Sequence, residues 1–341
     1  MFTVTDHERK TGAFEPEKLA HILHQISTEG YAVVGRLVSE ESCNLLGQAI
    51  LEDIEQVRSL ARPTRHEINT AAGHLQLGLR RSGDYIRADL VANPLIEHLV
   101  TGVLGKGAWL GFYNGNVNLP GSGFQKVHYD RPYSWLTEEE AKADGQTWPP
   151  PTTTLSCSIA LTDITEDNGA TEIYPKSHHE TEVTKWPLGE RVSSHPELLE
   201  RWQPPARMPI PAGAICFRDP RMWHRGVPNN GEAPRPMIAL TYHAGQCLHW
   251  RGRLVRDASE ADITQCQENP ALKILDDGSL GDARLVFDAS AQDTFQASEN
   301  LHGINRNVRF LDPPARVNHF VDAHEIGGAR ISLSGEIGPN V

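Results

Sequence analysis

Two side chains of the segment QKVHYD could bind a metal ion together. His128 and Asp130 are separated by one residue, and residues i and i+2 of a strand point to the same face. An imidazole and a carboxylate on one face can supply two of the three ligands of a facial metal site. A His-x-Asp tripeptide also arises by chance, so the pair predicts a metal site only if the chain provides a third ligand.

A later segment, GAICFRDPRMWHRG, provides such a ligand. Its apolar beginning predicts a buried strand, and the turn after that strand would bring His224 to the mouth of a barrel. Arg235 begins the next apolar run, RPMIALTYH. A guanidinium in such a strand is costly unless it meets an anion, and its planar fork suits a carboxylate. Taken singly, His224 could be a structural histidine and Arg235 a solvated residue at a strand end.

The whole pattern predicts oxidation chemistry with iron(II). Two neutral imidazoles and one carboxylate leave three coordination positions of Fe(II) open. A 2-oxo acid such as 2-oxoglutarate chelates through its keto oxygen and C1 carboxylate and fills two of them, and O2 can take the third. The distant C5 carboxylate then needs a cation, which is the role predicted for Arg235. His128, Asp130 and His224 are the predicted metal ligands and catalytic residues.

Three stretches resemble the phytanoyl-CoA dioxygenase (PhyH-like) family of Fe(II)/2-oxoglutarate oxygenases. They are HYD at 128–130, ALTDITEDNGATEIYPKSHH at 160–179 and GAICFRDPRMWHRGVPNNGEAPRP at 213–236. The resemblance extends over about residues 110–245. It implies a double-stranded β-helix and the oxidative decarboxylation of 2-oxoglutarate to succinate and CO2, with Fe(II) as cofactor and O2 as second co-substrate.

The resemblance adds two residues and one departure. Gln125 and Thr171 match polar residues that contact 2-oxoglutarate in this family. On an ideal strand a residue at i−3 does not share the face of His128, so this role for Gln125 requires a β-bulge. Some members place a serine two residues after the arginine to contact the C5 carboxylate, whereas this chain has Met237 there. Related halogenases lack the metal-binding carboxylate, so Asp130 disfavours halogenation.

The elements that position these residues are predicted in two regions. The first is helical, with helices at 16–29, 39–60 and 92–105 and a short strand, YAVVGRLV, after Gly30. After about residue 107, short runs with strand character follow one another between turns rich in glycine and proline. This texture predicts a mainly β fold, a cupin-like jelly roll (double-stranded β-helix), with N-terminal helices on its flank.

We therefore expect one Fe(II)/2-oxoglutarate oxygenase domain over 1–341. Residues 1–106 form its helical flank, 107–249 its jelly-roll core and 250–341 a C-terminal extension. The polar, then proline-rich stretch 136–151 is an insertion in the core, and its position directly after the ligand strand suggests a lid.

Composition narrows the partners and the compartment. The net charge is −12, without a cluster of Lys and Arg, so nucleic acids and anionic membranes are not expected partners. The five cysteines form no CxxC pair, and the chain shows neither a secretory start nor a membrane-spanning run. The sequence predicts a cytoplasmic protein, monomer or homodimer, that acts on a small molecule such as a natural product.

Other readings of the same residues stay open. One is a cupin-like metal isomerase or hydrolase that activates water on zinc; it would have no need of Arg235. Another is a non-catalytic protein that binds a small molecule in the same barrel. Four further histidines could compete as metal ligands, and we expect none of them to bind the metal: His178, His179, His243 and His249. Aromatic and methionine residues near the barrel are expected to belong to its core.

Overall fold

The fold was analysed in a computed structural model of the chain. The structure describes residues 1–58, 73–78, 85, 87–91, 93–105, 108–131, 133–186, 191–202 and 204–244, together with the backbone of three short strands near the C-terminus. None of the helices in these ranges is long and apolar enough to cross a membrane.

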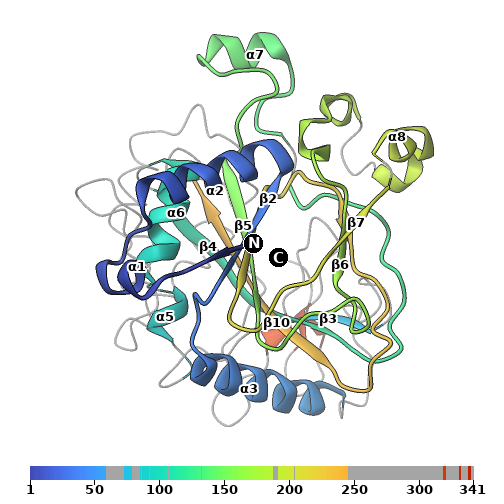
Figure 1. Ribbon diagram of the computed structural model, residues 1–341. Coiled ribbons are helices and arrows are strands. Elements are labelled where there is room, and N and C mark those ends of the chain that lie inside the picture. Colours follow the sequence, from blue (N-terminus) through green and yellow to red (C-terminus); the bar gives the residue numbers. More distant parts are fainter. Residues whose placement is uncertain are drawn as a thin grey trace.

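A large sheet forms the centre of the molecule (Figure 1). Its strands follow in the order β1-β2-β8-β5-β10-β4-β3-β11. Their bounds are Phe2–Thr3 (β1), Tyr31–Gly35 (β2), His74–Gly78 (β3), Trp109–Asn118 (β4), Thr154–Ala160 (β5), Ile215–Arg218 (β8), Arg235–His243 (β10) and Asn318–His319 (β11). Apart from the parallel β1–β2 pair, neighbouring strands are antiparallel. Strands β12 (Arg330–Ile331) and β13 (Ile337–Gly338) pair separately.

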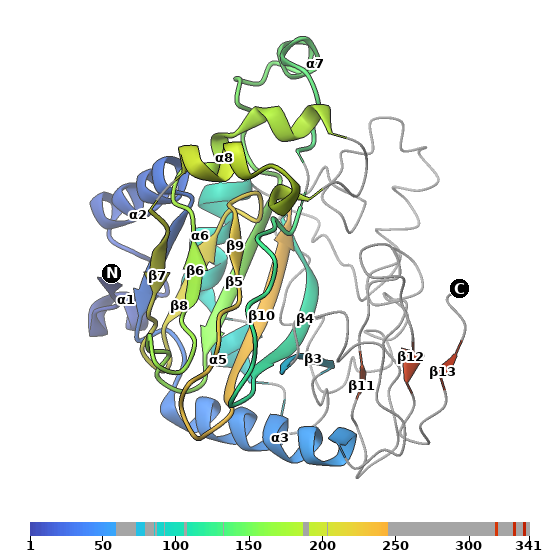
Figure 2. The same cartoon turned by 90° about the vertical axis from the view of Figure 1, so that its right-hand side faces the viewer.

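A second, smaller sheet faces the large one and encloses the interior of the barrel (Figure 2). It contains β7 (Ala206–Met208), β6 (Thr171–Ile173) and β9 (His224–Arg225), in that order. The two sheets form the predicted jelly roll, because β4, β5, β8 and β10 make one wall and β6, β7 and β9 make the other.

Helices cover the outer face of the large sheet, as Figure 2 shows for α2 and α6. Helix α2 (Pro16–Glu29) ends at Gly30, whose φ of 89° only glycine adopts at little cost. The helices that the structure describes are α1 (Asp6–Thr11), α2, α3 (Glu40–Arg58), α5 (Ala88–Val91), α6 (Pro94–Leu104), α7 (Glu138–Ala143) and α8 (Pro196–Arg201). Those predicted at 16–29, 39–60 and 92–105 correspond to α2, α3 and α6.

Strand β10 shows how the sheet separates core from site. Ile238 and Leu240 point outward and pack with Ile22 and Leu99 of the covering helices. Met237 lies on the alternate face and packs with residues of the smaller sheet. Burying the outer face of the sheet against helices stabilises it by about 25 cal/mol per Å² of apolar surface. The inner face is thereby left for polar residues and for chemistry.

One predicted strand differs in the structure. The segment QKVHYD was expected to be a strand with a bulge at Gln125, but only His128 makes a ladder bridge, and Asp130 lies in a bend. The reason is a competing partner, since the Asp130 N–H donates to the carbonyl of Pro220 (2.8 Å) in the turn before His224. The 136–151 insertion carries α7, which projects from the body in both views (Figures 1 and 2).

Candidate active site

Backbone pairing brings the two predicted metal-ligand histidines together. The N–H of His128 donates to the carbonyl of His224 (3.0 Å), and the N–H of His224 donates to that of His128 (2.9 Å). Directly opposed residues of an antiparallel pair share a face, and the two imidazole centroids lie 4.4 Å apart. Residues distant in sequence thus become cross-strand neighbours.

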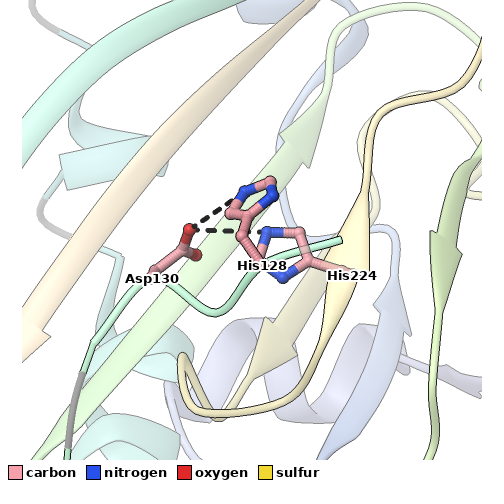
Figure 3. A group of neighbouring side chains, drawn as sticks. All are labelled: His128, Asp130 and His224. Atoms are coloured by element: carbon pink, nitrogen blue, oxygen red, sulfur yellow. Dashed lines mark ion pairs between the residues drawn. The ribbon is translucent and has the colours of Figure 1, made fainter. Parts of the chain in front are cut away.

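Asp130 completes the group from the bend beside them. Its Oδ1 lies 3.8 Å from His128 Nε2 and 3.4 Å from His224 Nε2, and one ligand atom from each of the three residues lies within 4.8 Å of the others. Figure 3 shows both imidazoles directed toward the carboxylate. The side chains of His128 and Asp130 are 35% and 34% exposed, which leaves one side of the group accessible.

Second hydrogen bonds set the imidazoles for metal binding. His128 Nδ1 is 2.8 Å from the Lys126 carbonyl, and His224 Nδ1 is 3.0 Å from the Met222 carbonyl. Because a carbonyl only accepts, Nδ1 carries the proton in each ring and Nε2 keeps its lone pair for a metal. Arg218 Nη1 also lies 3.1 Å from His224 Nδ1. We place the proton on His224 Nδ1, which then donates to the Met222 carbonyl. Arg218 Nη1 is itself a donor, so it makes no hydrogen bond to the protonated Nδ1.

Charge at the site favours deprotonated ligands. Loss of hydration opposes ionisation of Asp130, but the neighbouring His224 and Arg218 outweigh it and lower the pKa of this carboxyl well below its usual value. Loss of hydration, reinforced by His224, lowers the pKa of His128 to about 4. At neutral pH His128 therefore offers a neutral imidazole and Asp130 a carboxylate, and together with His224 they form the donor set that suits Fe(II) with open positions.

Arg218 is a site residue that the sequence analysis missed. Its side chain is 7% exposed, and its Nη2 lies 2.5 Å from Asp130 Oδ2. Arg218 thus occupies one carboxylate oxygen and leaves Oδ1 toward the histidines. An arginine at the end of the apolar run AICF was the available signal, but its partner is far away in the sequence.

Arg235 lies in a buried position without an anion. Its residue is 5% exposed, and its contacts are neutral: Nε donates to the Asn168 carbonyl (3.4 Å) and Nη2 to that of Gly169 (3.0 Å). Among the described residues no carboxylate pairs with it. Burial lowers the pKa of Arg235 to about 10, so its guanidinium remains charged at neutral pH. A buried cation of this kind fits a carboxylate ligand.

The hydrogen bonds around Gln125 show the bulge that its predicted role requires. A regular ladder would pair Lys126 with Gly226, but the N–H of Gln125 donates to Gly226 instead (2.9 Å). The extra residue puts Gln125 on the face of His128 and releases the Lys126 carbonyl for the His128 ring. Gln125 Oε1 accepts from the Gly226 N–H (2.8 Å), which leaves its amide donors for another partner.

Gly226 is required at this place by close packing. A Cβ atom there would lie 2.5 Å from His74 Cε1 and 2.7 Å from Gln125 Oε1. Such distances are shorter than real contacts, so any larger residue would displace Gln125. The glycine two positions after His224 thereby allows the bulge to pack against β9.

Thr171 begins β6 and faces the interior. Ile173 is paired directly with His224, and Thr171 is two residues before it, so both lie on the face that His224 uses. Glu172 points to the other face and pairs with Arg225 (2.7 Å). Thr171 is therefore oriented toward the interior as predicted, and its contact with 2-oxoglutarate stays a prediction.

Within the described part of the chain, His128, Asp130 and His224 form the one group of His, Cys, Asp or Glu that could bind a metal. His178 is buried and bonded through Nε2 to the Ser27 carbonyl (3.0 Å), and His243 lies beside Thr154 (3.3 Å), both away from that group. His179 contacts the same Ser27 carbonyl. His249 lies outside the described residues.

The large side chains near the site belong to the core. Residues Tyr133, Trp135, Met222 and Trp223 are at most 4% exposed. Trp135 donates to Asp144 (2.6 Å) and so attaches the 136–151 insertion to the body. Tyr133 and Trp223 pack in one apolar cluster and Met222 in another, as expected for core residues.

A jelly roll that brings two histidines and one carboxylate together is typical of the class of non-haem Fe(II) oxygenases. The sequence profile described as phytanoyl-CoA dioxygenase (PhyH) matches residues 26–237. This is more than half of the chain, which therefore belongs to the PhyH family. The expected enzyme class, with Fe(II), 2-oxoglutarate and O2, is confirmed by this membership.

Known proteins that are similar to this chain in sequence or structure include the following. Dioxygenase trt7 of Aspergillus terreus (strain NIH 2624 / FGSC A1156) is 26% identical over 231 residues, 66% of this chain and 72% of the fungal protein. The epimerase SnoN, solved with Fe3+, alpha ketoglutarate and nogalamycin RO, has a TM-score of 0.50 at 16% identity and covers 68% of this chain and 86% of its own. The carbocyclase SnoK has a TM-score of 0.48 at 19% identity, over 72% and 88%.

Proposed function

We propose that this dioxygenase oxidises a small natural product and couples the oxidation to conversion of 2-oxoglutarate into succinate and CO2. Hydroxylation is the proposed outcome. Desaturation and ring closure start from the same removal of a substrate hydrogen and are the other outcomes that such a site supports. Iron with 2-oxoglutarate and O2 supplies the oxidising power, and the protein supplies binding and orientation.

The observation that carries the proposal is the orientation of the three ligand atoms. His128 Nε2, His224 Nε2 and Asp130 Oδ1 point toward one another because their other polar atoms are already bonded to carbonyls or to Arg218. A site oriented before the metal arrives needs little rearrangement on binding. These three residues would bind Fe(II).

Three other residues would bind the co-substrate. The buried Arg235 would pair with the C5 carboxylate of 2-oxoglutarate, because this cation has no anionic partner among the described residues. Gln125 has amide donors available on the face of His128, and Thr171 adds a hydroxyl from β6. An enzyme that only activates water on zinc would not explain a buried arginine of this kind, which favours the oxygenase over the cupin-like hydrolase.

The substrate class follows from charge and from the relatives. The chain carries a net charge of −12 and lacks a basic cluster that could bind the phosphates of an acyl-CoA. SnoN was solved in complex with Fe3+, alpha ketoglutarate and the small molecule nogalamycin RO. We propose a neutral or cationic small molecule of specialised metabolism as the substrate.

The direct experiment measures succinate. Purified protein given Fe(II), ascorbate and 2-oxoglutarate should release succinate slowly even before the substrate is known, and Asp130→Ala should abolish both this release and iron retention. Substituting Zn(II) for Fe(II) serves as the control without redox chemistry. Unchanged succinate release by Asp130→Ala, or none by the iron-loaded native protein with any small-molecule substrate, would reject the proposed function.

A further inference from the structure

Asn116 lies on the inner face of the large sheet with a polar group that has no partner. Its Oδ1 is buried and makes no hydrogen bond. Val117, the next residue of β4, packs with the helices on the outer face, so Asn116 points to the interior. Asn118, which shares this face, donates to the carbonyl of Val227 just beyond β9 (2.9 Å). An enclosed amide oxygen without a partner is costly, which indicates that a ligand completes this position.

The strand register places Asn116 beside the predicted co-substrate pocket. Asn116 is directly opposite Met237, and Asn118 is directly opposite Arg235. Opposed residues have Cβ atoms about 4.5–5.5 Å apart. Met237 offers no hydrogen-bond donor, and the amide of Asn118 is already bonded to Val227 and Ser122. Among the described amides of β4 near Arg235, that of Asn116 is thus the one whose oxygen is unbonded.

The same register shows on which side of Arg235 this amide lies. Arg218, which contacts Asp130, is opposite Ser156, and Ser156 is opposite Thr241. The metal ligands therefore lie at the Thr241 end of β10, while Arg235 begins the strand. The pair formed by Asn116 and Met237 is one step from Arg235 toward that end. Asn116 therefore lies on the stretch of this wall between Arg235 and the metal ligands, where a molecule that spans the two would come within its reach.

We propose that Asn116 binds the co-substrate, by donating a hydrogen bond from its side-chain amide to the C5 carboxylate of 2-oxoglutarate beside Arg235. The inference rests on the proposed function. A half-turn of the amide exchanges oxygen and nitrogen, which are nearly the same size. The side-chain nitrogen then takes the enclosed position and can donate to the carboxylate. Arg235 supplies the positive charge, and the Asn116 amide donates a hydrogen bond to a carboxylate lone pair that Arg235 does not use.

The test compares two keto acids in the full-length protein loaded with Mn(II), which binds without turnover. 2-Oxovalerate keeps the chelating keto acid of 2-oxoglutarate but has a methyl group in place of the C5 carboxylate. Calorimetry should show that Asn116→Ala weakens 2-oxoglutarate about ten- to a hundredfold, the range of a hydrogen bond to a charged group. The affinity for 2-oxovalerate should change less than twofold, and exposed Asn230→Ala should change neither.

Two further variants keep the outcome decisive. Asn116→Asp has the same shape but places a carboxylate against the C5 carboxylate, so it should weaken 2-oxoglutarate more than Asn116→Ala does. Met237→Ser in the Asn116→Ala background should restore part of the affinity for 2-oxoglutarate, because it places a hydroxyl donor on β10 directly opposite position 116 of β4. Equal weakening of both keto acids, or no weakening, would overturn the role of Asn116. Failure of the native protein to bind 2-oxoglutarate would overturn the proposed function as well.

Discussion

Arg218 and Asp130 form an ion pair inside the barrel, between Nη2 and Oδ2 at 2.5 Å. The arginine comes from β8 in the large sheet and the aspartate from the bend that follows His128. Asp130 uses its other oxygen, Oδ1, toward the two histidines. One carboxylate is thus shared between a permanent cation of the protein and the position proposed for Fe(II). Such a partner fixes the orientation of a ligand before the metal binds.

Replacing Arg218 by Met should destabilise the metal-free protein more than the metal-bound protein. The substitution leaves Asp130 without its cation, and because that side chain is one-third exposed we expect about 1–3 kcal/mol rather than the larger cost of a fully buried pair. A bound divalent ion replaces the lost partner. Thermal unfolding with and without Mn(II) should therefore show a larger metal-induced rise in Tm for Arg218→Met than for the native chain.

Arg221→Met is the matched control for that measurement. It breaks the nearby buried pair with Asp219 (2.6 Å), which is not a metal ligand. It should lower Tm in both states and leave the metal-induced rise unchanged. A smaller metal-induced rise for Arg218→Met than for native protein would contradict this prediction, and would show that the orientation of Asp130 by Arg218 outweighs the loss of its positive charge.

Replacing Arg235 by Ala should weaken 2-oxoglutarate and spare the metal. Loss of a charge-assisted contact costs about 1.5–3 kcal/mol, or roughly ten- to 150-fold in affinity. Arg235→Lys keeps the charge without the planar fork, so its affinity for 2-oxoglutarate should lie between those of the native protein and Arg235→Ala. The dependence of succinate release on 2-oxoglutarate concentration, with Mn(II) affinity measured alongside, checks this. An unchanged apparent KM for 2-oxoglutarate would show that another cation binds the C5 carboxylate.

Gln125→Glu should separate the two roles assigned to this side chain. Glutamate keeps an acceptor for the Gly226 N–H but loses the amide donors and adds a negative charge beside a dianion. We expect 2-oxoglutarate affinity to fall at least tenfold while Mn(II) affinity changes little. Gln125→Ala removes the acceptor too, so it should loosen the bulge and weaken the metal about tenfold. If Gln125→Glu and Gln125→Ala changed the affinities for 2-oxoglutarate and Mn(II) equally, Gln125 would not bind 2-oxoglutarate and would serve only to hold the backbone at Gly226.

Stability should depend on pH through Glu8, far from the site. This residue is 0% exposed, and its carboxylate bonds to Lys18 (2.6 Å) and the Thr5 N–H (2.8 Å). Burial opposes its ionisation, but these bonds prevail and lower the pKa from 4.5 to about 2. A depressed pKa stabilises the fold above pH 4.5, and this contribution is lost as the pH falls toward 2.

Glu8→Gln tests this directly. The variant should lose about 1–3 kcal/mol of unfolding free energy at pH 7, and its difference from the native chain should shrink as the pH is lowered from 5 to 3. Denaturant unfolding at several pH values measures both, and exposed Glu17→Gln is the control. A difference that stays constant down to pH 3 would contradict the shifted pKa of Glu8.

The sequence alone determined the class of fold, and it predicted the group of three residues that the structure brings together, because both depend on local signals. Alternating apolar runs between turns predicted the strands, and Gly30 predicted the end of α2. Ligand chemistry restricted the metal site to a few residue types, so His128, Asp130 and His224 could be selected by their order. The bulge at Gln125 was also deduced, since the face required for that residue excluded a regular strand.

Only the tertiary structure decided which distant residues share one small volume. The pairing of Arg218 with Asp130 and the position of Asn116 opposite Met237 depend on strand order and register, which no local pattern records. The bend at Asp130 was missed for the same reason, as its cause is the carbonyl of Pro220 from another segment. Sequence periodicity predicts to which face of a strand a side chain points, whereas only the packed chain defines which residues it contacts there.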